Sequence, residues 1–267
     1  MLFDLDNTLI LEDEATFDAL RVTCDVARER VAVDAASLYA ETLRAADALW
    51  RASPSFEYAD RMGIWWGEGL WGEFSGDAAG LRALRAFVPQ FRRATWRAAL
   101  TSLGVSDTSL ADELAEAYRR TRRTGQHVDP DAEWALDQLA PYRLALVTNG
   151  APDVQREKLA GTDLARRFDA IVISAELGVA KPDRRIFDAT LAALGVSALD
   201  AVMVGDSLAR DVAGAQNAGV SAVWIDRAGT PPKPEDPVPA ARIRALSELP
   251  QALAAMRTGA ASPRGSP

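Results

Sequence analysis

The sequence predicts an α/β protein in which a doubly wound parallel sheet carries an inserted, all-helical domain. Between residues 143 and 226, short apolar or β-branched runs alternate with helical segments, a pattern typical of βαβ units on a parallel sheet. Residues 1–3 form one further apolar run, whereas residues 13–123 show helical spacing of apolar side chains and no strand pattern. Because the isolated first strand needs the later sheet for pairing, the helical stretch is interpreted as an insertion between strands one and two.

The predicted strands and helices can be assigned to residue ranges along the chain. Residues 1–3 are expected to form a short buried strand, and the helical stretch is expected to hold four or five helices with breaks near Pro54, Gly76 and Gly104. Later strands are predicted within 143–149, 169–175, 199–206 and 221–226, with helices between them within 152–161, 183–195 and 208–219. The chain then continues with a proline-rich loop, a final helix and a tail expected to be disordered: 230–239, near 247–257, and 258–267.

This topology divides the chain into two parts. An α/β core is predicted from residues 1–12 and 124–257, and a helical cap from residues 13–123. In doubly wound sheets, ligands bind beyond the carboxyl ends of the strands. Polar side chains that follow the predicted strands are therefore the candidates for function.

The composition excludes several kinds of site. The 267 residues include one cysteine, Cys24, and one histidine, His127, too few for a structural zinc site or a disulfide, and no hydrolase elbow is present for serine catalysis. Catalysis is therefore expected to use carboxylates, hydroxyls and lysine. A net charge of −8 argues against nucleic acid as the main partner. Since no apolar run approaches the length of a membrane span and no basic signal segment opens the chain, a cytoplasmic location is predicted.

Two carboxylates follow the first strand, in the segment 4-DLDNT-8. Positions i and i+2 of an extended chain point to the same side, which brings Asp4 and Asp6 together at the end of the strand. Their repulsion favours a cation between them or a proton on one of them, so one can act as nucleophile and the other as proton donor. The alternative is a solvated turn, where Asp and Asn are common.

The second strand ends in 147-VTNG-150, and Pro152 begins the next helix. Backbone N–H groups at such a helix start, together with the Thr148 hydroxyl, can hold phosphate oxygens. A capped strand-to-helix turn without any ligand has the same pattern, so this alternative stays open.

Lys181, in 180-AKPD-183, is one of three lysines, and the other 27 basic residues are arginine. In such a background, a lysine beside a strand end indicates a need for a compact point charge, which suits phosphate. The alternative is a surface lysine, and this is the prediction for Lys158 and Lys233.

The fourth strand end carries Asp206, and Asp211 follows it in the first turn of a helix, in 205-GDSLARD-211. Together with Asp4, these residues concentrate carboxylate oxygens at one edge of the sheet, which suits a hard, oxygen-seeking ion such as Mg²⁺. The helix dipole also favours acidic residues in a first turn, so Asp211 has a purely structural alternative.

These four segments, in this order, resemble the four motifs of the haloacid dehalogenase superfamily. They are similar to its D-x-D-x-T motif, its threonine, its lysine and its G-D-x-x-x-x-D motif, and they span the core from 4-DLDNT-8 to 205-GDSLARD-211. The resemblance implies a Rossmann-like core with the family's type-one helical cap. Segments 148–159 and 202–211 are most similar to the N-acylneuraminate phosphatase and nucleotidase-like branch.

Carried over by position, the resemblance implies a Mg²⁺-dependent phosphatase that acts on a small ester such as a sugar phosphate or nucleoside monophosphate. Asp4 would attack phosphorus to form an aspartyl-phosphate, and Asp6 would protonate the leaving group and then activate water. The implied metal ligands are Asp4, the Asp6 backbone carbonyl, Asp206 and Asp211. The implied phosphate-binding residues are Thr148, Asn149 and Lys181.

Asp6 also separates activities within the family. Dehalogenase members resemble D-x-Y-G-T, which lacks the second carboxylate because a halide leaving group needs no acid, so Asp6 favours phosphatase or phosphotransferase chemistry. Hydrolysis of a C–halogen bond and a non-catalytic binding module of the same fold remain as alternatives. The expected partner is a small phosphate ester, with no nucleic acid or membrane partner, and the protein is predicted to be a monomer or homodimer.

The cap is expected to select the substrate, and it holds five of the seven tryptophans: Trp50, Trp65, Trp66, Trp71 and Trp96. For any one of them, packing in the cap's own core is the favoured interpretation, with one or two left to stack on a substrate ring. Arg21 and Arg51 are candidates to meet an anionic substrate.

Overall fold

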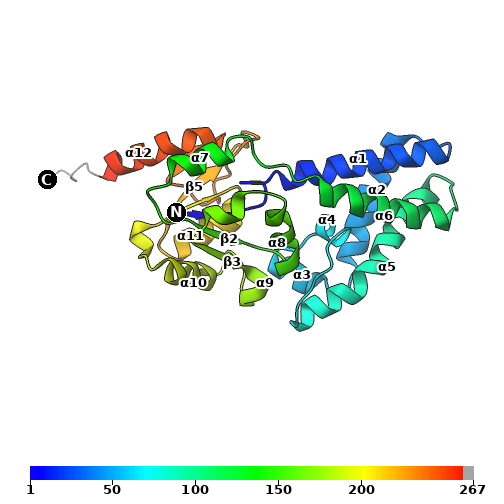
Figure 1. Cartoon of the computed structure of the whole chain (residues 1–267), viewed down its shortest axis with the longest axis horizontal. Coiled ribbons are helices and arrows are strands. Elements are labelled where there is room, and N and C mark those ends of the chain that lie inside the picture. Colours follow the sequence, from blue (N-terminus) through cyan, green and yellow to red (C-terminus); the bar gives the residue numbers. More distant parts are fainter. Residues whose placement is uncertain (261–267) are drawn as a thin grey trace.

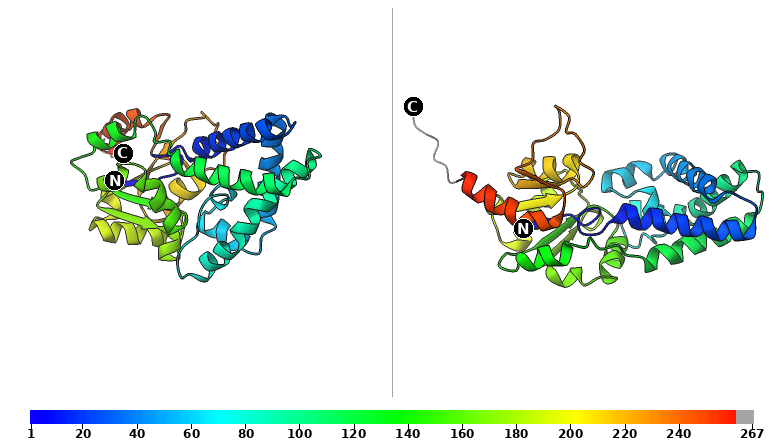
Figure 2. Two further views of the ribbon diagram at one scale, coloured as in Figure 1. Left: turned by 45° about the vertical axis from the view of Figure 1, so that its right-hand side comes forward. Right: turned by 90° about the horizontal axis from the view of Figure 1, so that it is seen from above.

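The computed structural model describes residues 1–260, which form two lobes (Figure 1). One lobe is an α/β core, and the other consists of helices. The same division is visible in the two further views (Figure 2). The predicted fold class, a doubly wound parallel sheet with an inserted helical cap, is confirmed.

The core is built on a parallel sheet with the strand order β3-β2-β1-β4-β5-β6. The two-residue β1 lies at its centre, where Leu2 pairs with Ala145 of β2 on one side and Met203 of β4 on the other. The order reverses between β1 and β4, which marks the point where such sheets bind ligands. The strands are β1 (Leu2–Phe3), β2 (Ala145–Thr148), β3 (Ala170–Ile173), β4 (Val202–Gly205), β5 (Ser221–Ile225) and β6 (Ala241–Ile243).

Strands β1 to β5 lie in the predicted segments, whereas β6 was not predicted. It is three residues long and follows a polar, proline-rich loop, so it has no alternating pattern of its own. Its extended conformation comes from pairing along β5, where Val223 lies beside Ala241.

The core helices and turns lie between and after these strands. They are α7 (Ala132–Gln138), α8 (Pro152–Ala160), η1 (Leu164–Arg167), α9 (Ser174–Leu177), α10 (Arg184–Leu194), η2 (Ala198–Asp200), the π-helical turn η3 (Leu208–Val212), α11 (Ala213–Asn217), η4 (Leu246–Glu248) and α12 (Leu249–Ala260). Helix α12 continues three residues beyond its predicted end, and the rest of the predicted tail, residues 261–267, lies outside the described residues.

Alternate residues of the strands face two different helical layers. Phe3 and Leu146 belong to the apolar cluster that includes side chains of α7 and α12. Their chain neighbours Leu2 and Ala145 belong to the cluster that includes side chains of α10 and α11. Burial of both faces explains why these strands are continuous apolar runs in the sequence.

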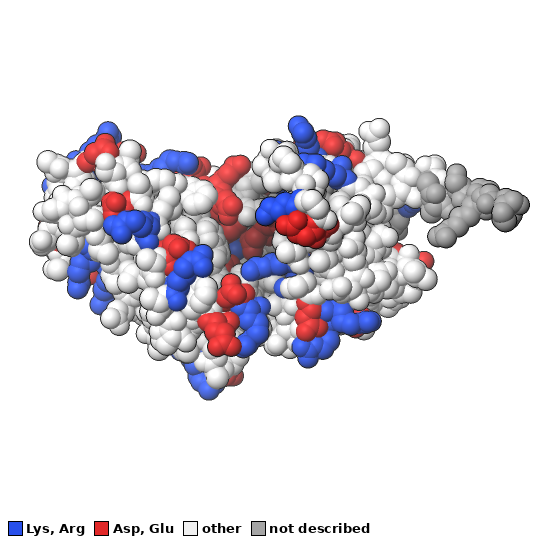
Figure 3. All heavy atoms as spheres, turned by 180° about the vertical axis from the view of Figure 1, so that it is seen from behind, with Lys and Arg blue, Asp and Glu red and all other residues white. Residues whose placement is uncertain are grey.

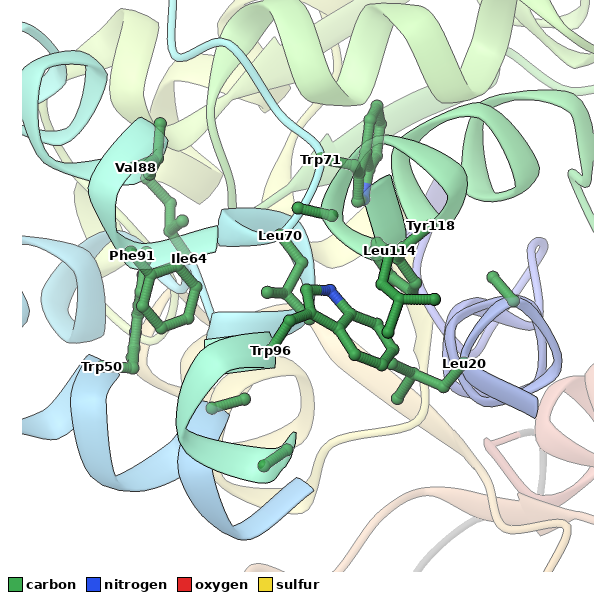
Figure 4. Packing of buried hydrophobic residues seen from close by; sticks show 14 of the residues in the cluster. Leu20, Trp50, Ile64, Leu70, Trp71, Val88, Phe91, Trp96, Leu114 and Tyr118 are labelled. Atoms are coloured by element: carbon green, nitrogen blue, oxygen red, sulfur yellow. The ribbon is translucent and has the colours of Figure 1, made fainter. Parts of the chain in front are cut away.

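In the described part of the chain, the cap contains six helices, whereas four or five were predicted. Two of the six are only seven and four residues long, too short to give a clear helical pattern in the sequence. Trp71, Trp96 and Tyr118 are fully buried and pack with Leu70 and Phe91 to form its core (Figure 4). The helices are α1 (Glu12–Arg30), α2 (Ala35–Arg51), α3 (Phe56–Met62), α4 (Trp66–Gly69), α5 (Ala79–Ser102) and α6 (Thr108–Thr124).

Two linkers that lie side by side join the cap to the core. The Leu11 N–H donates to the His127 carbonyl at 2.7 Å, and the Asp129 N–H donates to the Leu9 carbonyl at 2.9 Å. Helix α1 begins at Glu12, and α6 ends at Thr124. We propose that the cap and the core are divided at residues 12/13 and 123/124. None of the described helices combines the length and apolar character needed to span a membrane.

Candidate active site

A cleft of about 450 Å³ lies between the core and the cap, beyond the carboxyl ends of β1 and β4. Acidic and basic side chains gather in this hollow between the lobes (Figure 3). Thr148 lies behind the lining and is fully buried. The other six residues predicted for the site line the cleft: Asp4, Asp6, Asn149, Lys181, Asp206 and Asp211.

Lys181 lies between two carboxylates in the cleft. Its Nζ donates to Asp4 Oδ1 and, at 2.7 Å, to Asp211 Oδ1, and all three side chains are almost fully buried. The second oxygen of Asp4 accepts from Thr8 Oγ1 at 3.3 Å, and that of Asp211 accepts from the Ser207 N–H at 2.9 Å. The two carboxylates are therefore fixed in place from both sides.

Gly205 permits this close approach of Asp211. A Cβ atom at Gly205 would lie 2.3 Å from the Asp211 carboxyl carbon, a distance that no side chain tolerates. The glycine of the G-D pair is thus required for packing of the later aspartate against the end of β4.

Burial and mutual repulsion raise the pKa values of two cleft carboxylates, Asp4 and Asp206. Burial raises the pKa of Asp4 to about 7, with Lys181 opposing and Asp211 adding to the rise. Burial likewise raises the pKa of Asp206 to about 8, and the charges of Asp4 and Asp211 add to it. Burial alone would lower the pKa of Lys181, but the two carboxylates raise it overall, so Lys181 is charged at neutral pH.

Asn149 and Thr148 use their side chains within the protein. Asn149 Nδ2 donates to the Lys181 carbonyl at 3.0 Å, and its Oδ1 accepts from the Lys181 N–H at 2.9 Å, so this amide holds the backbone of the lysine segment. The Thr148 hydroxyl accepts from Gln155 Nε2 at 2.6 Å. Contacts of either residue with phosphate stay predictions.

Asp6 is held by two side chains of α8. Gln155 Nε2 donates to Asp6 Oδ2 at 2.8 Å, and Lys158 Nζ donates to Asp6 Oδ1 at 2.8 Å. The prediction that Lys158 is a surface lysine is wrong, because its side chain is fully buried. The cap covers this face of α8 and brings Glu68 Oε1 to 2.9 Å from the ammonium, while Glu12 Oε2 lies 3.3 Å away.

The neighbouring carboxylates keep Lys158 charged. Burial alone would lower the pKa of Lys158, but Asp6, Glu12 and Glu68 together raise it. Burial raises the pKa of Glu68 to about 7, with Lys158 opposing the rise. Glu12 also accepts from Arg122 Nη2, so two cations face three carboxylates in this cluster.

The tryptophans divide between the cap core and the cleft. Trp71 and Trp96 are fully buried in the cap core, and Trp50 is buried there as well although it also lines the cleft, which agrees with the packing interpretation. Trp65 and Trp66 line the cleft with their ring centroids 4.8 Å apart, which leaves an aromatic surface on the cap side.

The chain matches a known protein family. The family model described as haloacid dehalogenase-like hydrolase matches residues 1–219, most of the chain and all four predicted motifs. The chain belongs to this family. The family resemblance predicted from the motifs is therefore confirmed.

Curated relatives of this haloacid dehalogenase-like chain are named as phosphatases. Phosphoserine phosphatase of Thermus thermophilus is 40% identical over 237 residues, which cover 88% of this chain and 91% of the relative. N-acylneuraminate-9-phosphatase of Rattus norvegicus is 35% identical over 170 residues, 62% of this chain and 68% of the relative. The second belongs to the branch that the motif segments predicted, and the first was not anticipated.

Solved structures of haloacid dehalogenase-like proteins share the fold. The HAD hydrolase YfnB from Bacillus subtilis, whose structure is described as bound to magnesium, aligns with a TM-score of 0.65 at 25% identity over 94% of this chain and 96% of that one. A 2-haloacid dehalogenase from Pseudomonas syringae aligns with a TM-score of 0.54 at 27% identity over 95% and 97%. The structural relatives thus include a named dehalogenase beside a hydrolase whose description names no substrate.

The acidic cluster of this haloacid dehalogenase-like chain fits a divalent metal, which phosphatases of the superfamily generally use. Asp4, Asp206 and Asp211 each offer one carboxylate oxygen, and these oxygens lie within 4.8 Å of one another. Carboxylate oxygens are the ligands that hard divalent cations prefer. A cation here would also offset the repulsion that raises the pKa values of Asp4 and Asp206.

Proposed function

We propose that this protein is a phosphomonoesterase that hydrolyses a small phosphate ester through an aspartyl-phosphate on Asp4, with Mg²⁺ as cofactor. The observation that carries the proposal is the placement of Asp4, Asp6 and Lys181 around one cleft, where Asp6 provides a second carboxylate for proton transfer. The phosphatase names of the curated relatives support it.

In the proposed first step, an Asp4 carboxylate oxygen attacks phosphorus, the bond from phosphorus to the ester oxygen breaks, and Asp6 gives its proton to that oxygen. In the second step, the Asp6 carboxylate takes a proton from water, the water oxygen attacks phosphorus, and the Asp4–phosphorus bond breaks to release inorganic phosphate. A carboxylate nucleophile needs no histidine, which suits a chain with one histidine.

Charge neutralisation is the main requirement of phosphoryl transfer. Lys181, hydrogen-bonded to Asp4, is placed to offset charge on the transferred group, and we propose that Thr148 and Asn149 also contact it. The proposed metal ligands are Asp4, the Asp6 backbone carbonyl and Asp206, with Asp211 ligating directly or ordering a bound water. The cation would supply additional positive charge beside the phosphoryl oxygens.

We expect Mg²⁺ to stabilise the fold more at about pH 8 than at about pH 5. The folded pKa values of Asp4 and Asp206, about 7 and about 8, lie above the unfolded value of about 4, so between these limits the folded state binds more protons. Without metal, the free energy of unfolding therefore falls as pH rises through this window, and a bound cation replaces the missing protons.

Thermal unfolding with and without Mg²⁺ at the two pH values measures this difference. An Asp206→Asn variant should lose most of the Mg²⁺-induced shift near pH 8. An equal shift at both pH values in the wild-type protein would contradict the assignment of the cation to these carboxylates.

The charges on the cap side of the cleft support a small, charged leaving group. Asp47, Arg51 and Asp60 line it from the cap, where Arg51 pairs with Asp47, and Arg210 lines it from the core, so charges of both signs are present there. An ester that carries both an ammonium and a carboxylate fits this arrangement. We therefore propose phosphoserine, after which the Thermus thermophilus relative is named, as the first ester to assay.

The test is release of inorganic phosphate from a panel of phosphoserine, sugar phosphates and nucleoside monophosphates, with Mg²⁺ present. Chloride release from 2-chloropropionate is measured in parallel. Turnover of at least one ester without chloride release is the expected result. Chloride release with no phosphate release across the panel would replace the proposal with C–halogen hydrolysis, and neither product would favour a non-catalytic module.

A further inference from the structure

Lys158 connects the cap to Asp6, and the proposed mechanism gives it no role. Its Nζ contacts Asp6 Oδ1 at 2.8 Å and Glu68 Oε1 at 2.9 Å. Asp6 follows β1 of the core, Lys158 lies on α8 of the core, and Glu68 lies on α4 of the cap. One ammonium thus joins a residue of the cleft to a residue of the helical lobe that covers it.

The surroundings make this connection specific. Lys158 is fully buried, and Glu68 is 1% exposed, so solvent cannot replace either partner. Glu68 is oriented by a hydrogen bond from the Trp65 N–H to its Oε2 at 3.4 Å, within the same segment that presents Trp65 and Trp66 to the cleft. The cap segment that faces the substrate therefore also carries the carboxylate that reaches Lys158.

The remaining contacts of Asp6 lie on α8 as well. Gln155 Nε2 holds Asp6 Oδ2 at 2.8 Å, so both carboxylate oxygens of Asp6 are tied to one face of this helix. The Asp6 side chain is 23% exposed and lines the cleft. Its direction is consequently set by Gln155 and Lys158 and not by solvent.

We propose that Lys158 is a positioning residue for Asp6, and that Glu68 makes this positioning depend on docking of the cap. The inference rests on the proposed phosphatase function. With the cap docked, Glu68 and Glu12 fix the ammonium where it aligns Asp6 with the leaving-group oxygen. With the cap displaced, Glu68 leaves, and the ammonium is no longer held on the cap side. Proton transfer is thereby restricted to the state in which the cap covers the substrate.

The experiment compares kcat/KM for two esters that differ in their need for an acid. Phosphoserine, or the best alkyl ester from the panel, has an alkoxide leaving group that must be protonated. An aryl ester, p-nitrophenyl phosphate, has a leaving group stable enough to depart without a proton. Lys158→Met should lower kcat/KM by roughly 10²-fold for the alkyl ester and by less than about threefold for the aryl ester.

A double-mutant cycle asks whether Lys158 acts through Asp6. If it does, Lys158→Met should add almost nothing to the loss on the alkyl ester already caused by Asp6→Asn. Equal losses on both esters, or losses that add fully in the cycle, would overturn the inference and assign Lys158 a structural role.

Glu68→Gln provides a second variant that should fold. It keeps the shape of the side chain, leaves Lys158 with Asp6 and Glu12, and balances the two cations of the cluster against two carboxylates. It should show the same preference for loss on the alkyl ester, by about tenfold. The matched control is Glu73→Gln, because Glu73 is an exposed cap glutamate that pairs with Arg119 and Arg123, and it should change neither rate.

The outcomes separate this inference from the proposed function. If wild-type protein hydrolyses neither ester, the proposed function fails, and the inference fails with it. If wild-type protein is active and Glu68→Gln behaves like Glu73→Gln, the proposed function stands and the dependence on the cap is overturned.

Discussion

Asp4→Asn is expected to lower the turnover of every phosphate ester by at least about 10⁴-fold, the scale of loss seen when an enzyme loses its nucleophile. An amide oxygen cannot form the acyl phosphate, and the remaining groups of the cleft only bind and orient the ester. Phosphate release under saturating substrate measures the loss.

This loss should occur without unfolding. Burial and the neighbouring carboxylates raise the pKa of Asp4 to about 7, so the ionised side chain is held at a cost that a neutral amide avoids. Lys181 still keeps Asp211 as a partner at 2.7 Å. The thermal midpoint of the variant should therefore equal or exceed that of the wild-type protein.

The matched control is Asp226→Asn. Asp226 is also a buried aspartate that follows a core strand, but it pairs with Arg242 and lies outside the cleft lining. This variant should keep most of its activity. Asp4→Asn that is folded and still turns over its ester would contradict the assigned nucleophile.

Lys181→Met is expected to impair both activity and stability. Loss of the ammonium beside Asp4 removes charge neutralisation from the phosphoryl group, and we expect kcat to fall by roughly 10²- to 10³-fold. It also leaves Asp4 and Asp211 buried without their shared cation, which costs roughly 3–5 kcal/mol of unfolding free energy. Chemical denaturation and steady-state kinetics measure the two effects.

The cost in stability should depend on pH. The pKa values of Asp4 and Asp206 are already raised by burial, and removal of Lys181 raises them further, so acid neutralises the crowded carboxylates. The destabilisation should accordingly be larger near pH 8 than near pH 5. Lys233→Met is the control, because Lys233 is exposed in a loop and should affect neither property. A destabilisation independent of pH would show that the carboxylates are not the cause.

The position of the site at one edge of the sheet could be predicted because each strand end has a local sequence pattern. Parallel strands bring their carboxyl ends to one edge, so Asp4, Lys181 and Asp206 needed only correct strand positions to be placed in one cleft. Strand position alone does not separate Asp206 from Asp226, since both follow strands, and the G-D-x-x-x-x-D motif is what singles out Asp206. In the structure, Arg242 pairs with Asp226, sixteen positions before it in the chain.

Lys158 shows where sequence reasoning stopped. The scarcity of lysine that points to Lys181 applies equally to Lys158, but Lys158 does not lie beside a strand end, and the sequence predicts a surface lysine there. Its burial arises because the cap brings Glu68 to α8 from 90 positions earlier in the chain. Such a contact depends on how the cap and the core pack against each other, and no local periodicity records it.

The most direct test of the account is to trap the phosphoryl group on the protein. Asp6→Asn lacks the base of the second step, so with p-nitrophenyl phosphate, whose leaving group needs no acid, the aspartyl-phosphate should form and accumulate. Acid quenching of a reaction with ³²P-labelled ester, followed by peptide mapping, should find close to one label per chain on the peptide that contains Asp4. Release of labelled phosphate by this variant with no label on Asp4 at any time would contradict covalent catalysis by this residue.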